Sequence, residues 1–321
     1  MAKVDVTVSI VNFRTFDLTS ACIKSVLSRT RGIACEVIVV DNHSADGSAE
    51  KLSRLFKSRI TLITNSHDVG FAAANNQALN LARGKYFVML NSDTRLLNNA
   101  FQILAAFMDR NSDCAVSGPA LFNPDGTCQK SYSNFKTPFQ RALWEIAPAL
   151  QSLGLMKNQS AEIPLVLPAH PIPVDRPRGV CFFVRGSFVD RVGKLDEGFF
   201  MYDEEVDWAY RFQKAGYKNY FVPDAEILHY GGASSRNPIL AQIHTLSDYR
   251  YYQKHYGLYA SLLIRAFALG ASFLWLVVFT KHLLLNQKSR LSSPLSRIRS
   301  SLGHALIFSP LINWQSLKRG T

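Results

Sequence analysis

The chain has 321 residues, of which 47% are hydrophobic and 12% aromatic, and its formal net charge is +12. This length fits one large domain or two small ones, and this apolar content excludes an intrinsically disordered chain. Because the first residues lack the apolar core of a signal peptide, we expect the N-terminus to stay in the cytoplasm. The cysteines lack the paired spacing of a metal site, so we expect reduced packing residues at Cys22, Cys35, Cys114, Cys128 and Cys181.

Short apolar runs alternate with amphipathic stretches through the first half of the chain. The pattern predicts strands at 4–11, 36–41, 60–64 and 86–90 and helices at 18–29, 48–56, 72–82 and 98–110. Strands that alternate with helices of about ten residues imply βαβ units around a mostly parallel sheet. We therefore predict an α/β fold.

The second half is less regular. Residues 131–178 contain seven prolines and are predicted to form a loop-rich insertion. Regular structure returns with a strand at 180–185, a helix at 204–215, and strands near 217–222 and 225–229. The expected organisation is one α/β domain over residues 1–247, followed by a helical tail over residues 248–321.

Positive charge is concentrated in this tail. Residues 248–321 hold ten Lys or Arg and one acidic residue, a balance of +9, which leaves about +3 for residues 1–247. The tail also contains the apolar run 262–279. Because its basic residues follow that run instead of interleaving with stacking aromatics, an anionic membrane surface is favoured over nucleic acid.

The apolar run is short for a membrane span. Residues 266–280 provide 15 uncharged positions, fewer than the roughly 20 that cross a bilayer. A longer window, 258–285, includes Arg265 and Lys281. We expect a monotopic or membrane-docked helix, with a hairpin or a true span as the alternative. The cations expected to face anionic lipid are Lys281, Lys288, Arg290, Arg297 and Arg299.

Two carboxylates follow predicted parallel strands. Asp93 comes just after the run 86–90, at the sheet edge where open α/β sheets bind ligands. There it can hold a divalent metal against a diphosphate, or it caps the next helix. Asp41 ends the second strand and can accept hydrogen bonds from a base or ribose, or it is a turn residue. If Asp93 binds a metal, His229 is the best second ligand; otherwise it is a structural histidine.

Two further motifs have both a functional and a structural interpretation. Gly70 precedes a helix whose N-terminus can bind a phosphate, although such turns are common. Four carboxylates occur within residues 203–207, where mutual repulsion can raise a pKa toward that of a general base. The alternative is a solvated helix start, and Asp207 lies four residues before Arg211, the spacing of a helix ion pair. The order of the motifs favours Glu205 as the base.

In this order the motifs resemble the inverting family 2 glycosyltransferases of GT-A fold, especially the rhamnosyltransferase-like branch. The resemblance covers roughly residues 4–256. The matching segments are Val8-Ser-Ile-Val-Asn-Phe13, Val39-Val-Asp-Asn-His-Ser44, Asn65 with Gly70-Phe-Ala-Ala-Ala-Asn-Asn76, Leu90-Asn-Ser-Asp93, Arg178 to Arg185, Val192 to Phe200, Glu204-Glu-Val-Asp207, Lys214-Ala-Gly-Tyr217 and His229-Tyr-Gly-Gly232.

The resemblance implies a role for each matching residue. Asp41 would contact the nucleoside, Asp93 would hold Mg²⁺ or Mn²⁺ on the diphosphate, and Glu205 would deprotonate the acceptor hydroxyl. The chain has Asn91 where the two-aspartate metal motif begins. It also has Glu204-Glu205 where the acidic pair commonly ends in Asp, so the base is uncertain by one residue. The implied donor-binding set is Asn12, Asp41, Asn42, Gly70, Asn76 and Asp93, and the implied catalytic set is Glu205, Glu204 and Asp207.

The implied function is transfer of a sugar, rhamnose being one candidate, from a nucleotide donor such as a dTDP- or UDP-sugar. The acceptor would be lipid-linked or a polysaccharide, at the cytoplasmic face of the membrane during cell-surface glycan synthesis. The alternative is a non-catalytic, membrane-docked nucleotide-sugar binder or assembly partner. Retention of Asp41, Asp93 and Glu205 favours the enzyme, because a binder does not need the acidic cluster.

Overall fold

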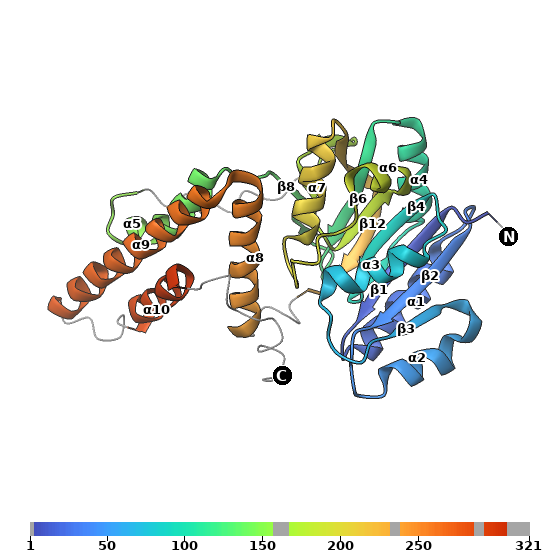
Figure 1. Ribbon diagram of the computed structural model, residues 1–321, viewed down its shortest axis with the longest axis horizontal. Coiled ribbons are helices and arrows are strands. Elements are labelled where there is room, and N and C mark those ends of the chain that lie inside the picture. The colour runs from blue at the N-terminus through green and yellow to red at the C-terminus, as the bar shows by residue number, and fades with distance from the viewer. Residues whose placement is uncertain (1–2, 157–166, 232–237, 286–291, 307–321) are drawn as a thin grey trace. The chain divides into compact units, whose positions relative to one another are not determined.

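The computed structural model describes residues 3–156, 167–231, 238–285 and 292–306 (Figure 1). The chain divides into two compact units. The first, here called the α/β unit, contains Met1–Phe135 and Leu165–Arg236; the second, here called the helical unit, contains Lys136–Pro164 and Asn237–Thr321.

The α/β unit is built on one large sheet with the strand order β3-β2-β1-β4-β11-β6-β12-β5. Its first four strands are parallel, β11 is antiparallel to both neighbours, and β12 is parallel to β6 and antiparallel to β5. These strands are β1 (Val6–Asn12), β2 (Cys35–Asp41), β3 (Thr61–Thr64), β4 (Tyr86–Asn91), β5 (Thr94–Leu96), β6 (Cys114–Phe122), β11 (Cys181–Arg185) and β12 (Lys218–His229).

Helices flank this sheet (Figure 1). Two apolar cores lie between the sheet and these helices. Because strand side chains alternate between faces, Val37 and Val39 join the core under α1 and α4, whereas Ile38 and Val40 join the core under α3 and α7. All four are buried, as expected for parallel strands covered on both sides. The predicted α/β fold is therefore confirmed. The helices are α1 (Phe16–Arg29), α2 (Ser48–Phe56), α3 (Phe71–Leu81), α4 (Ala100–Arg110), α6 (Gly186–Val192) and α7 (Glu204–Lys214).

Several short strands were not expected from the sequence. β5 follows Asp93 directly, so Asp93 does not cap a helix; the N-cap of α4 is Asn99. The strands predicted near 217–222 and 225–229 form the single strand β12, which has a register shift between Val222 and Glu226. The remaining short strands are β7 (Cys128–Gln129), β8 (Tyr132–Ser133), β9 (Ile172–Val174) and β10 (Arg176–Pro177).

The helical unit corrects two predictions. Residues 131–178 are not simply loop-rich, because they contain α5 (Pro138–Ser152). Thr137 and Gln140 form a capping box there and Pro138 occupies the first turn, where proline is favoured. The predicted boundary at 247/248 falls inside α8 (Pro238–Tyr256), so the helical unit starts earlier and includes α5. Its other helices are α9 (Leu258–Leu284) and α10 (Ser292–Leu306).

Candidate active site at the strand ends

Asp93 and His229 lie together, as the sequence predicted, although 136 positions separate them. Antiparallel pairing of β5 with β12 places His229 opposite Thr94, and the Tyr230 amide donates to the Asp93 carbonyl at 2.9 Å. The Nε2 atom of His229 is 3.4 Å from Oδ2 of Asp93, and both side chains are partly exposed. Sheet pairing therefore presents one carboxylate and one imidazole to the same point.

Gln129 sets the orientation of the His229 ring. Its side-chain nitrogen donates to the His229 carbonyl at 2.8 Å and to Oδ1 of Asn123 at 2.6 Å, so its oxygen faces Nδ1 of His229 at 2.8 Å. Because that oxygen can only accept, Nδ1 carries the proton. The lone pair of a neutral ring then lies on Nε2, directed toward Asp93. Gln129 was not predicted, because nothing in a two-residue strand marks it as a partner of His229.

This pair fits a divalent cation shared with a substrate. Carboxylate oxygen and imidazole nitrogen are both ligands for Mn²⁺, and the oxygen suits Mg²⁺. Within the part of the chain that the structure describes, no group of three or more His, Cys, Asp or Glu residues could hold a metal. Asp93 and His229 would thus be two ligands, with diphosphate and water oxygens supplying the others.

The Asp41 side chain forms hydrogen bonds with residues near the ends of β1 and β2. Its Oδ2 accepts from Nδ2 of Asn12 and Oγ of Ser44, both at 2.6 Å, and its Oδ1 accepts from the Ser44 amide at 3.0 Å. Asp41 and Asn12 are buried. The same loops hold His43 and Ala45 at φ of 66° and 54°, a conformation that non-glycine residues seldom adopt. The structural interpretation of Asp41 is therefore observed, and its nucleoside contact stays a prediction.

Asn42 and Gly70 belong to a second bonded loop. The Asn42 side-chain oxygen accepts from Asn65 at 3.0 Å and from the Val69 amide at 3.1 Å. Gly70 has a φ of +87°, and a Cβ there would lie 2.6 Å from the Phe200 carbonyl oxygen. That oxygen accepts from the first helical amide, Phe71, at 2.6 Å. One amide of this helix start is thus bonded to a protein carbonyl, and the phosphate contact stays a prediction.

Asn76 also has protein partners. Its Nδ2 donates to the Leu195 carbonyl and to Oε1 of Glu197, both at 2.9 Å, and its Oδ1 accepts from the Leu195 amide at 3.2 Å. These bonds attach α3 to the segment that leads to the acidic cluster. In the structure Asn76 positions that segment, and its donor contact stays a prediction.

Glu205 lies beside the strand that leads to Asp93. Its Oε1 is 2.9 Å from Nη1 of Arg176, and a Cβ on Gly179 would lie 2.9 Å from its Cγ. The carbonyl of Val180, the residue after Gly179, accepts from the amide of Asn91 at 2.9 Å. The glycine therefore leaves room for the Glu205 side chain against the end of β4. Arg176 and Gly179 were missed by the sequence analysis, because only folding brings them to Glu205.

The neighbouring acids have different environments. Glu204 is buried, its Oε2 has no partner among the described residues, and burial together with Glu205 raises its pKa well above the usual range. The raised pKa means that the charged form of Glu204 is disfavoured. Asp207 is fully buried and pairs with Nε of Arg211 at 2.8 Å, the helix ion pair that its spacing indicated. Glu205, whose Oε1 pairs with Arg176, stays the predicted base, with Glu204 as the alternative one residue earlier.

Comparison with known proteins shows what the chain is similar to. Residues 7–160 match the domain described as Glycosyl transferase family 2. An N-acetylglucosaminyl-diphospho-decaprenol L-rhamnosyltransferase of Mycobacterium tuberculosis is 25% identical over 218 residues, which cover 63% of this chain and 69% of that enzyme. A UDP-Glc:alpha-D-GlcNAc-diphosphoundecaprenol beta-1,3-glucosyltransferase of Escherichia coli is 36% identical over 93 residues, which cover 29% of this chain and 36% of that enzyme.

A solved structure shows the same fold. The mannosyltransferase PcManGT of Pyrobaculum calidifontis, in complex with GDP-Man and Mn²⁺, superimposes with a TM-score of 0.57 at 14% identity, covering 95% of this chain and 86% of that one. The α/β unit thus has the GT-A fold. Residues 7–160 of the chain resemble glycosyltransferase family 2, and the longer match to the rhamnosyltransferase extends this likeness.

Proposed function

We propose that this chain is an inverting, metal-dependent glycosyltransferase. It transfers a sugar from a nucleoside-diphosphate donor, with dTDP- and UDP-sugars and rhamnose as first candidates, to a lipid-linked or polysaccharide acceptor in cell-surface glycan synthesis. The observation that carries the proposal is the placement of the Asp93–His229 pair and the Arg176–Glu205 pair around the end of β4. One pair suits a diphosphate-bound cation and the other a base.

Glu205 performs the acid–base chemistry. Arg176 fixes one carboxylate oxygen, and the other accepts the proton of the acceptor hydroxyl. The hydroxyl oxygen forms a bond to the anomeric carbon as the bond from that carbon to the diphosphate oxygen breaks, and the nucleoside diphosphate leaves with the electron pair. Attack opposite the leaving group inverts the anomeric configuration. A positioned base of this kind contributes about 10²–10⁴-fold in rate.

Two buried polar atoms lie near the base. Nε of Arg176 and Oε2 of Glu204 have no hydrogen-bond partner within the described ranges. A buried polar group without a partner is costly, so we expect an ordered water to bond to these atoms.

Asp93 and His229 would hold Mg²⁺ or Mn²⁺. When bound, such a cation stabilises the negative charge of the departing diphosphate. The Mn²⁺ in the structure of PcManGT with GDP-Man supports this proposal. The ring orientation imposed by Gln129 also supports it, because it directs Nε2 toward the carboxylate.

The acceptor and the location follow from the relatives and from α9. The two relatives are named for polyprenyl-diphosphate acceptors, which reside in membranes. α9 has 27 residues and a mean hydropathy of 2.2 in its most apolar window. We place the chain on the cytoplasmic face, with α9 docked on an anionic surface. Lys281, Arg297 and Arg299 are exposed as this requires; Lys288 and Arg290 lie outside the described residues.

A nucleotide-sugar panel tests the proposal. Purified protein is scored by thermal shift with each donor, with and without Mn²⁺, and then by transfer to N-acetylglucosaminyl-diphospho-polyprenol in vesicles. We expect one nucleotide class to stabilise the protein in the presence of Mn²⁺ and to be consumed. Donor binding without transfer or hydrolysis would instead support a non-catalytic binder.

A further inference from the structure

α5 exposes large apolar side chains and buries charged ones, which is the reverse of a helix that faces water. Phe139 and Trp144 are 55% and 65% exposed, with Leu143 between them also exposed. The side chains of Arg141 and Glu145, by contrast, are only 12% and 7% exposed. An amphipathic helix in water buries its apolar stripe and exposes its charges. The outer face of α5 is therefore adapted to an apolar environment.

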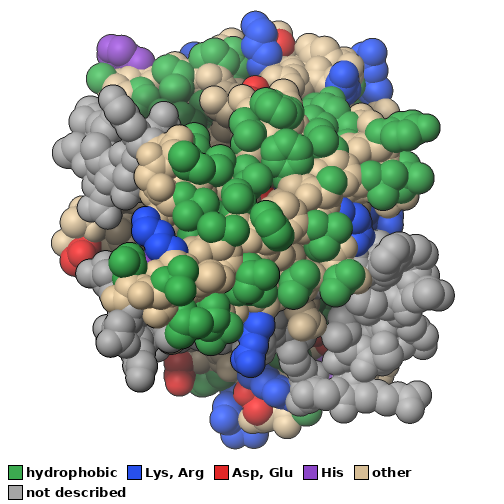
Figure 2. Space-filling view, turned by 90° about the vertical axis from the view of Figure 1, so that its left-hand side faces the viewer, with side chains coloured by type: hydrophobic (Ala, Val, Ile, Leu, Met, Phe, Trp, Pro, Cys, Tyr) green, Lys and Arg blue, Asp and Glu red, His purple; other side chains and the backbone are tan. Residues whose placement is uncertain are grey.

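The exposed face of α9 continues this surface. α9 buries a stripe that includes Ala268, Ala271 and Trp275, and it exposes Leu269 and Phe273. Figure 2, which looks onto the helical unit, shows hydrophobic side chains gathered over a broad face with Lys and Arg around it.

α5 and α9 pack directly against each other. The rings of Phe139 and Phe267 are 6.2 Å apart, and a Cβ on Gly270 would lie 3.8 Å from Cδ1 of Ile146. Ala149 belongs to the same small core as Trp275. The two exposed faces are thus held side by side by ordinary helix packing.

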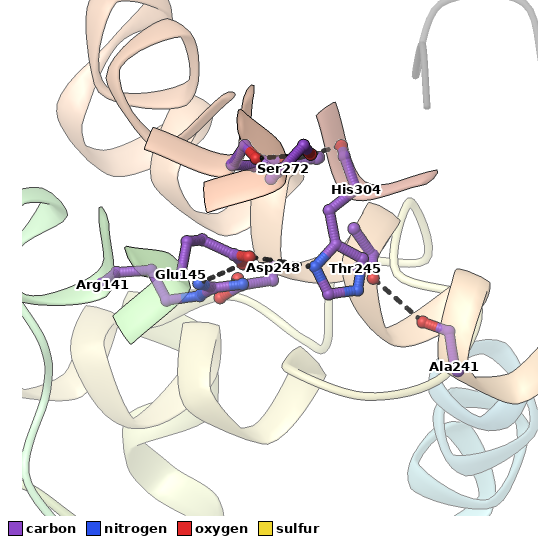
Figure 3. A network of polar contacts seen from close by, with 9 residues as sticks. Arg141, Glu145, Ala241, Thr245, Asp248, Ser272 and His304 are labelled. Carbon is purple, nitrogen blue, oxygen red and sulfur yellow. Dashed lines mark hydrogen bonds and ion pairs between the residues drawn. The ribbon is translucent and has the colours of Figure 1, made fainter. Parts of the chain in front are cut away.

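A charged network on the inner side fixes the rotation of α5 (Figure 3). Nη1 of Arg141 is 2.7 Å from Oε1 of Glu145, and Arg141 also pairs with Asp248 of α8. Nδ1 of His304 in α10 lies 3.2 Å from Oε2 of Glu145. Because breaking a buried pair is costly, these bonds keep the charged side of α5 inward. Phe139 and Trp144 therefore remain outward.

Charge identifies the partner of this surface. The helical unit contains thirteen Lys or Arg and three Asp or Glu, a balance of +10, whereas the α/β unit is close to +2. Such a surface repels a second copy of itself and attracts anionic lipid. Lys136 also lies over the Trp144 ring, a pairing of cation and aromatic ring suited to the membrane–water interface. The inner charged network is unsuited to the hydrocarbon core, which favours shallow insertion.

We propose that α5 and α9 form one interfacial surface, which inserts Phe139, Trp144, Leu269 and Phe273 into one leaflet of an anionic bilayer. This inference rests on the membrane docking in the proposed function and adds α5 to it. It makes a segment far from the C-terminal tail in sequence part of the membrane contact.

Vesicle flotation of the full chain tests the inference. The vesicles contain phosphatidylcholine with phosphatidylglycerol, and pure phosphatidylcholine serves as the neutral comparison. We expect Phe139→Glu with Trp144→Glu to lower partitioning about tenfold or more, since charged groups oppose interfacial burial. Leu269→Glu with Phe273→Glu should act similarly. The matched control, Leu55→Glu with Leu81→Glu, alters side chains of the α/β unit that are 47% and 50% exposed and should float like wild type.

The outcomes separate the two proposals. If the α5 variant floats like wild type while the α9 variant does not, α9 docks alone and this inference is overturned, although membrane docking stands. A wild-type chain that does not float overturns both. A lipid-free dimer that the α5 variant abolishes would assign this face to a second copy and contradict the bilayer.

A conservative substitution keeps the inference testable if the Glu variants misfold. Trp144→Phe keeps an aromatic ring at the site and removes one fluorophore. Lipids brominated along the acyl chain should quench wild-type tryptophan fluorescence, and Trp144→Phe should lose most of that quenching. Equal quenching of the two proteins would show that Trp144 does not reach the acyl chains and would overturn the inference.

Discussion

The two units place charge and apolar surface in opposite ways. In the α/β unit, Val and Ile side chains of the strands fill two closed cores, and the ion pairs Lys85–Asp109 and Lys218–Asp113 are exposed. In the helical unit, Arg141, Glu145 and Asp248 are inside, whereas the rings of Phe139, Trp144 and Phe273 are outside. The first arrangement is that of a protein surrounded by water, and the second suits a lipid boundary. The proposed catalytic site thus lies in the α/β unit, and the proposed membrane contact lies in the helical unit.

Asp93→Asn should have the largest effect, on the α/β unit alone. The amide keeps the shape but removes the negative charge facing Nε2 of His229, so we expect turnover to fall by about 10³-fold or more. Vesicle binding and the melting temperature should not change. Initial rates across a Mn²⁺ titration measure the effect, and Asp113→Asn is the control for loss of an exposed carboxylate. Near-normal turnover with unchanged metal dependence would remove Asp93 from the site.

Glu205→Gln should come next. Gln keeps the reach of Glu and its contact with Arg176 but cannot take a proton, so we expect kcat to fall by about 10²-fold or more. Donor affinity, measured by calorimetry, should be preserved. Glu204→Gln and Asp207→Asn are the controls. If Glu204→Gln loses turnover and Glu205→Gln keeps it, the base has been assigned one residue too late.

Glu145→Gln probes the helical unit and should leave the chemistry intact. Burial alone would raise the pKa of Glu145, but the hydrogen bond from His304 and the charge of Arg141 hold it below its usual value. Its contribution to stability is therefore present above the unfolded pKa of about 4.3 and is lost as pH falls through the lower folded pKa.

We expect Glu145→Gln to lower the free energy of unfolding by about 2 kcal/mol at pH 7, with a smaller difference from wild type in acid. Denaturant melts at pH 7 and pH 3 measure this. Glu50→Gln, at an exposed position of α2, should lie within about 0.5 kcal/mol of wild type. An equal destabilisation at both pH values would show that the charge of Glu145 is not what matters.

Gly179→Ala should give the smallest effect on rate. The added methyl would meet the Glu205 side chain at 2.9 Å and displace it. Because small misplacements of catalytic groups are costly, we expect kcat to fall about tenfold while the KM for the donor is unchanged. Gly303→Ala, where a methyl meets no atom within 4 Å, is the matched control. Unchanged kcat would mean that Glu205 tolerates the shift or does not act as the base.

Local patterns predicted the α/β unit well, because each buried strand is a continuous apolar run. They also led to the Asp93–His229 pair, since Asp93 follows one strand of the sheet and His229 ends another. They did not predict Arg176, Gly179 or Gln129, whose roles arise only from long-range pairing. They failed for α5 because its outer face is apolar and the prolines of the surrounding segment suggested loops. A capping box at Thr137 and Gln140 was the local signal available.

The most direct test of the central claim is the anomeric configuration of the product. The full chain is incubated with Mn²⁺, each nucleotide sugar and N-acetylglucosaminyl-diphospho-polyprenol in anionic vesicles, and any glycolipid formed is analysed by NMR. We predict a product whose anomeric configuration is inverted relative to the donor, and none with Asp93→Asn. A product with retained configuration, or equal product from Asp93→Asn, would contradict an inverting transferase that acts through this site.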